Sequence, residues 1–138
     1  MSKIVFCGDG GVGKTTLIKK ILINEFEQRY VPTLGVEVHP IDIGTKKFTV
    51  WDVAGQEKYS LGYDQLFENA SKVVIFYDST SSLSFKNINF WERKIPPQCS
   101  DIIYVRTKCD ISRNINKHIQ EEICISTKNN TNLLSIFK

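Results

Sequence analysis

The sequence contains no long hydrophobic run, and no apolar stretch approaches the roughly 20 residues that a membrane-spanning helix needs. A strand-like segment begins directly after the first residues, so we expect no signal peptide. No internal repeat, linker or low-complexity segment divides the chain. With 138 residues, 41% of them hydrophobic and 24% charged, the sequence predicts one globular domain over residues 1–138.

A strong charge of one sign and paired cysteines are also absent. The net charge is +3 and no basic run exceeds two residues, which favours a solvated surface and no direct contact with nucleic acid. The four cysteines show no C-x-x-C spacing, so we expect thiols in a reducing compartment rather than a metal site or disulfides. The last residues carry no cysteine motif for prenylation, so no lipid anchor is expected.

Strand-like and helix-like segments alternate along the chain. This alternation predicts an α/β domain with a mostly parallel central sheet, one antiparallel hairpin strand and helices on both faces. The hairpin turn is expected at Gly44-Thr45-Lys46, and a loop is expected from about Glu25 to Gly35. Strands are predicted at 3–7, 36–43, 47–53, 72–78, 101–108 and 122–126, and helices at 14–24, 83–95 and from 132 onward.

One turn holds four of the eight glycines. Gly8-Asp9-Gly10-Gly11-Val12-Gly13-Lys14-Thr15 matches G-x-x-x-x-G-K-[ST] in full, between a predicted strand and a predicted helix. Backbone N–H groups of such a loop surround a polyphosphate, and the helix dipole adds to the attraction. Lys14 is expected to reach the β- and γ-phosphates and Thr15 to bind Mg²⁺. The expected nucleotide-binding residues here are Gly8, Asp9, Gly10, Gly11, Val12, Gly13, Lys14, Thr15 and Thr16, without indicating which nucleotide or reaction.

A second motif, Trp51-Asp52-Val53-Ala54-Gly55-Gln56-Glu57, ends the third predicted strand. An aspartate at this place can hold Mg²⁺ through water, and Gly55 can offer its N–H to a γ-phosphate. Gln56 is placed to orient an attacking water, so we expect Gln56 and Lys14 to be catalytic.

Two further stretches select the base. Thr107-Lys108-Cys109-Asp110 ends a later strand, near the carboxyl edge of the sheet where ligands bind. The Asp110 carboxylate can accept hydrogen bonds from the N1 and N2 groups of guanine, a donor pattern that adenine lacks. Ser126-Thr127-Lys128 can present a backbone N–H to the guanine O6. His39 and His118 show no partner spacing and are assigned no chemistry.

In this order and spacing the motifs resemble the Ras superfamily of small GTPases over nearly the whole chain. Within it, EFEQRYVPT (25–33), TLGVEVHP (33–40) and VWDVAGQEKY (50–59) are most similar to the Ran branch of nuclear-transport GTPases. The resemblance implies a Ras-like P-loop fold and further roles. Thr33 resembles the switch threonine that closes onto Mg²⁺ and the γ-phosphate. Phe26 resembles the aromatic that lies across guanine, and Tyr30 the switch tyrosine near the phosphates. Gly10 matches the position where a side chain would crowd Gln56.

Two departures from the family pattern stand out. Thr107 replaces the usual asparagine, whose amide contacts the base and the phosphate loop, and a lost hydrogen bond would cost up to about tenfold in affinity. We expect Asp110 to preserve guanine selectivity. The second departure is a short C-terminal side, with a truncated final helix that ends at Lys138.

The expected function is a guanine-nucleotide switch that hydrolyses GTP to GDP with Mg²⁺, slowly without an activating protein. Expected partners are a GTPase-activating protein, an exchange factor and nuclear-transport receptors, with a monomeric chain in nucleus and cytoplasm. Two alternatives stay open. One is a Rab-type vesicle-traffic GTPase, and the other is a non-catalytic binding module derived from a GTPase.

Overall fold

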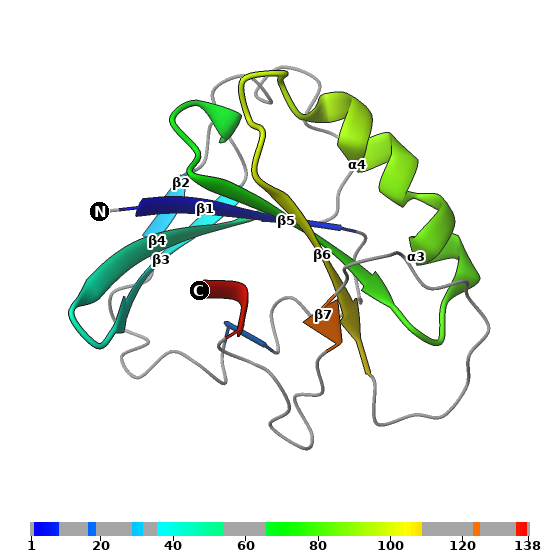
Figure 1. The fold of residues 1–138 in the computed structure, drawn as a ribbon, viewed down its shortest axis with the longest axis horizontal. Coiled ribbons are helices and arrows are strands. Elements are labelled where there is room, and N and C mark those ends of the chain that lie inside the picture. Colours follow the sequence, from blue (N-terminus) through cyan, green and yellow to red (C-terminus); the bar gives the residue numbers. More distant parts are fainter. Residues whose placement is uncertain are drawn as a thin grey trace.

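A computed structural model describes residues 2–8, 17–18, 29–31, 36–53, 66–108, 123–124 and 135–137 of the chain. Their centre is a twisted sheet that runs across the molecule (Figure 1). None of the described helices is both long and apolar enough to cross a membrane.

The sheet has seven strands in the order β2-β3-β4-β1-β5-β6-β7. Strand β1 pairs in parallel with β4 and β5, and β5, β6 and β7 continue the parallel part. The pairs β2–β3 and β3–β4 are antiparallel. The predicted α/β class with a mostly parallel sheet is therefore confirmed. The strands are β1 (Ser2–Cys7), β2 (Arg29–Val31), β3 (Val36–Ile43), β4 (Lys46–Val53), β5 (Lys72–Asp78), β6 (Ile102–Thr107) and β7 (Ile123–Cys124).

The antiparallel edge contains one strand more than the sequence predicts. The hairpin is as expected, because Ile43 pairs with Lys46 and leaves Gly44-Thr45 as a two-residue turn, with a φ of 62° at Gly44. Strand β2, however, lies within the segment predicted as a loop. Its three residues pair with Val36–Val38 of β3. A strand this short forms because it pairs with the edge strand β3, and the local residue preferences of the sequence do not reveal such pairing.

The two central strands are buried on both faces. In β1, Ile4 and Phe6 point into one core and Val5 and Cys7 into the other. This alternation follows from the two-residue period of a strand, and burial on both sides explains the continuous apolar runs of β1 and β5. The first core contains helical Leu17 and Ile18 and the C-terminal residues Ile136 and Phe137. The second contains Ile88, Trp91 and Ile95.

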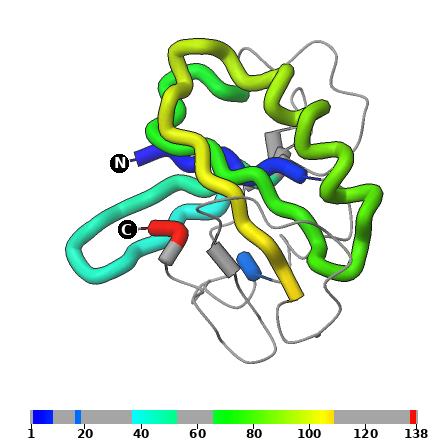
Figure 2. The backbone as a smooth tube through the Cα atoms, turned by 45° about the vertical axis from the view of Figure 1, so that its right-hand side comes forward, coloured from blue at the N-terminus to red at the C-terminus, as the bar shows by residue number. Residues whose placement is uncertain are grey.

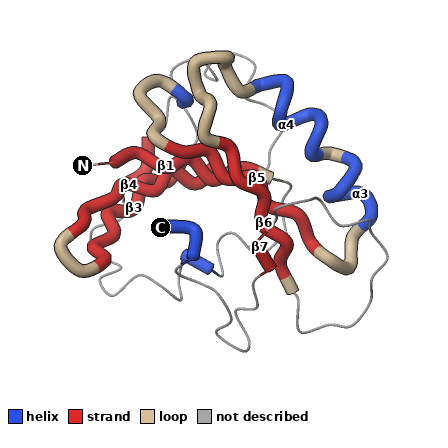
Figure 3. Tube along the Cα trace, viewed as in Figure 1, coloured by secondary structure: helices blue, strands red, loops and turns tan. Residues whose placement is uncertain are grey.

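Helical segments therefore cover both faces, as predicted. Helices α3 (Ser82–Lys86) and α4 (Ile88–Lys94) lie on one side of the sheet, and the 3₁₀ helix η2 (Ser135–Phe137) lies on the other. The views in Figures 1 and 2 agree on this arrangement, and Figure 3 shows the helices in blue on either side of the red strands.

Two helix predictions need correction. The helix predicted over 83–95 is divided at Asn87, whose ψ of −2° departs from the α-helical value. It still ends before Pro96, as expected, because Ile95 is extended. The second concerns the helix predicted from residue 132 onward: its described residues, Ser135–Phe137, form a 3₁₀ helix rather than an α-helix, and burial of Ile136 and Phe137 holds it.

Candidate functional site

The carboxyl ends of the parallel strands meet at one edge of the sheet. Gly8 directly follows β1, β4 contains Asp52 near its end, β5 ends at Asp78, and β6 ends at Thr107. From β1 the chain continues to β2, β3 and β4 on one side of β1, and then to β5, β6 and β7 on the other side. The strand order therefore reverses between β1 and β5, and ligands of open α/β sheets bind at such a switch point.

Gly8 begins the phosphate-loop motif at this switch point. Its φ is +140°, and a Cβ added there would lie 2.6 Å from the backbone oxygen of Phe76 in β5. A glycine is needed here because the backbones of β1 and β5 approach each other closely. At this first glycine of the motif, the close contact is with the neighbouring strand β5.

Asp52 is buried at the same edge, with 6% of its surface exposed. Glu37 of β3 pairs with it in register, and His39 lies two residues further on the same face. The ligand atoms of Glu37, His39 and Asp52 all lie within 4.8 Å of one another, and among the described residues they form the one such group of three. Carboxylate oxygens are the ligands that Mg²⁺ prefers, so the Asp52 carboxylate at this edge fits a magnesium ion.

The sequence assigned no chemistry to His39, yet the structure brings it beside two carboxylates. Its Nε2 lies 3.3 Å from Oε2 of Glu37, and its side chain is almost fully buried. Within the described part of the chain, neither ring nitrogen has a partner with hydrogen-bond geometry. The i, i+2 spacing of Glu37 and His39 on a strand was the signal that could have predicted their proximity.

The ends of β5 and β6 are joined by four hydrogen bonds. The Ser79 N–H donates to the Thr107 carbonyl oxygen at 3.1 Å, and the Ser79 hydroxyl donates to the Lys108 carbonyl oxygen at 2.9 Å. The Thr107 hydroxyl donates to the Tyr77 carbonyl oxygen at 3.2 Å. The fourth is the 2.6 Å bond from the Lys108 ammonium to the Asp78 carboxylate.

Further contacts stabilise the ion pair between Lys108 and Asp78. The Asp78 side chain is 7% exposed, and its other oxygen accepts from the N–H and the hydroxyl of Thr80 at 2.8 and 2.6 Å. Burial acts to raise the pKa of the Asp78 carboxyl, but the hydrogen bonds from Lys108 and Thr80 outweigh it and hold the pKa below its usual value. Asp78 is thus a charged group that the sequence-based site did not include.

Lys108 has an unusual backbone conformation. Its φ is 59°, in the left-handed region that costs a non-glycine residue roughly 1–2 kcal/mol. Such a conformation persists where the surroundings fix it. Here the Lys108 carbonyl oxygen accepts from Ser79, just after β5, and the ammonium group donates to Asp78, the last residue of β5. Lys108, the first residue after β6, is therefore fixed to the end of β5.

Four of the predicted site residues lie along one edge of the sheet in the described part of the chain. They are Gly8, Asp52, Thr107 and Lys108. Tyr30 lies in β2. The other predicted site residues lie outside the described part: Asp9, Gly10, Gly11, Val12, Gly13, Lys14, Thr15, Thr16, Phe26, Thr33, Gly55, Gln56, Asp110, Ser126, Thr127 and Lys128.

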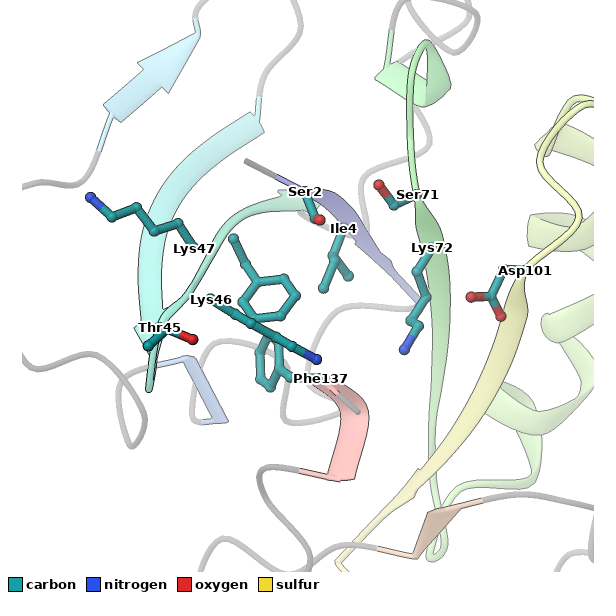
Figure 4. Close-up of a pocket in the computed structure, with 10 residues that line it drawn as sticks. Ser2, Ile4, Thr45, Lys46, Lys47, Ser71, Lys72, Asp101 and Phe137 are labelled. Carbon is teal, nitrogen blue, oxygen red and sulfur yellow. The ribbon is translucent and has the colours of Figure 1, made fainter.

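A pocket of about 590 Å³ lies at the opposite edge of the sheet (Figure 4). It is lined by residues at the amino ends of the parallel strands, among them Ser2 of β1, Lys46 of β4 and Lys72 of β5, and by Phe137. The Lys72 ammonium donates to the Ile136 carbonyl oxygen at 3.0 Å, which connects η2 to the sheet. Because none of the predicted site residues lines this pocket, we place the candidate site at the carboxyl edge.

The fold and the residues at this edge together define a P-loop α/β protein. In the sequence the Gly-rich motif directly follows the central parallel strand β1, and Asp52 lies next to the last residue of the adjacent strand β4. The family model of the Ras family matches residues 3–136. The chain therefore belongs to the Ras family, and this membership supports a GTP-binding switch as its general function.

Proposed function

We propose that the chain binds GTP and GDP and hydrolyses GTP slowly, as a molecular switch. The observation that carries the proposal is the complete phosphate-loop motif of residues 8–15, which follows β1 in a chain matched by the Ras family over residues 3–136. The burial of Asp52 at the same edge supports a metal-assisted phosphate site.

The residues predicted to lie around the phosphates and the metal have separate roles in this proposal. Thr15, Thr33 and Asp52 would hold Mg²⁺, which when bound neutralises charge on the phosphate oxygens. Lys14 contacts the β- and γ-phosphates, Gly55 offers its N–H to the γ-phosphate, and Gln56 orients the attacking water.

The base has a separate set of contacts. Asp110 accepts hydrogen bonds from guanine, and Ser126-Thr127-Lys128 presents a backbone N–H to the guanine O6. Phe26 lies across the base. Guanine is favoured over adenine because adenine lacks the donors that a carboxylate at residue 110 requires.

The proposal extends to the Ran branch. The segments TLGVEVHP and VWDVAGQEKY support a role in nuclear transport, with an activating protein, an exchange factor and nuclear-transport receptors as partners, in nucleus and cytoplasm. Two loops, about 25–35 and 54–64, would be ordered by the γ-phosphate and released after hydrolysis, so that hydrolysis changes the binding partner.

Hydrolysis stimulated by activating proteins tests both the proposed GTPase activity and the proposed Ran-branch role. The parent chain should hydrolyse GTP faster with a Ran-type activating protein than with a Rab-type one. Gln56→Leu should keep nucleotide binding and lose the stimulated hydrolysis, because the attacking water is no longer oriented. Stimulation by the Rab-type protein alone would favour the vesicle-traffic alternative. A folded chain that binds GTP without any hydrolysis would favour the binding module.

A further inference from the structure

Thr107 and Lys108, the first residues of the motif that carries predicted base contacts, are held from the end of the neighbouring strand. Ser79 is fully buried and bonds the backbone of both Thr107 and Lys108, through its N–H and its hydroxyl. Asp78 bonds the Lys108 ammonium at 2.6 Å. Residues 78 and 107 are register partners, so these bonds extend the β5–β6 pairing past the end of the sheet.

Thr107 takes part in this junction. Its hydroxyl has one proton to donate, and that proton is directed at the Tyr77 carbonyl oxygen. The residue is 3% exposed, so its side chain lies within the protein rather than on a surface that a base could cover. The usual asparagine of the family could contact the base and the phosphate loop from this place, whereas the threonine contacts the neighbouring strand.

We propose that Asp78 and Ser79 are positioning residues of the base-binding loop, and that Thr107 belongs to this anchor and does not contact the base. In this arrangement Lys108 is held before the nucleotide arrives, because its carbonyl oxygen and its ammonium group are both bonded to the end of β5 and the residue after it. A loop that is already ordered loses less conformational entropy on binding, so the anchor slows nucleotide release. This inference rests on the proposed guanine-nucleotide function.

The test is a double-mutant cycle on the release of a fluorescent GDP, with Asp78→Asn, Lys108→Met and the double variant. Asp78→Asn keeps an oxygen for Thr80 but loses the charge that holds Lys108, and should speed release about three- to tenfold. In the Lys108→Met background the same substitution should change release by less than about twofold. The control is Asp101→Asn, an exposed aspartate before the other end of β6, which should leave release unchanged.

Equal acceleration in both backgrounds would contradict the proposal, because a general loss of structure does not depend on Lys108. If Asp78→Asn does not fold, Ser79→Ala serves instead. It removes one neutral hydrogen bond and should speed release about two- to fivefold, while unchanged release would overturn the anchor. A parent chain that binds no guanine nucleotide overturns the proposed function first, before any variant is compared.

Discussion

At the scale of single residues, Gly8 shows most clearly how the sequence fixes a conformation. A side chain at this position meets the backbone oxygen of Phe76 at 2.6 Å and must also adopt a φ of +140°. Backbone atoms of a buried strand move little, so the clash is not relieved by a rotamer change.

Gly8→Ala should therefore destabilise the chain by about 2–5 kcal/mol, measured by urea unfolding. Gly44 provides the matched control, because its φ is also positive, at +62°, but a Cβ there meets nothing within 4 Å. Gly44→Ala should lose only the conformational part, about 1–2 kcal/mol. Equal losses at the two glycines would show that the approach of Phe76 does not matter.

His39 and Lys108 show what single-residue patterns do not contain. His39 meets Asp52 only through the register of β3 and β4, and that register is set by the hairpin turn. The Lys108–Asp78 pair depends on a left-handed backbone at Lys108 and on the pairing of β5 with β6. Neither the register nor this conformation can be read from the residue types alone.

At the scale of elements, the ion pair at the ends of β5 and β6 makes their junction sensitive to acid. The Asp78 carboxyl has a pKa below its ordinary value of 3.8 in the folded chain, so the unfolded chain takes up the proton first as the pH falls. The stability that this pair contributes is present above about pH 3.8 and is lost as the pH falls through the folded pKa.

The difference in unfolding free energy between the parent and Asp78→Asn should thus be constant near neutral pH and shrink below about pH 3.8. Urea unfolding across the acid range measures it. Asp101→Asn, at an exposed aspartate, is unfolded in the same series as the matched control. A difference that stays constant down to pH 2 would mean that Asp78 is not stabilised as a carboxylate.

Elements with long apolar runs were predictable, and short ones were not. Strands β1, β5 and β6 follow from residues that are buried on both faces, and the β3–β4 hairpin follows from its glycine turn. Strand β2 and η2 have three residues each, and their structure comes from tertiary contacts: pairing to β3 in one case, burial of Ile136 and Phe137 in the other. The division of the 83–95 helix at Asn87 is likewise not indicated by the apolar pattern of that segment.

At the scale of the whole molecule, the topology brings distant motifs to one place. Gly8, Asp52, Asp78 and Thr107 lie far apart in sequence, and the parallel strands carry all four to the same edge. The location of the candidate site was therefore predictable once the strands were known, since ligands of such sheets bind at the carboxyl edge. The bonds that hold Lys108 to Asp78 and Ser79 were not predictable, because they depend on how the ends of β5 and β6 meet.

The central claim is that this edge binds guanine nucleotide with magnesium. Titration of the purified chain with fluorescent GDP, GTP and ATP, with and without Mg²⁺, tests it most directly. The account predicts binding of guanine nucleotides at least about a hundredfold tighter than of ATP, because adenine leaves the Asp110 carboxylate without donors. It also predicts that removal of Mg²⁺ weakens the binding. Comparable affinities for GTP and ATP, or no binding to a folded chain, would contradict the account.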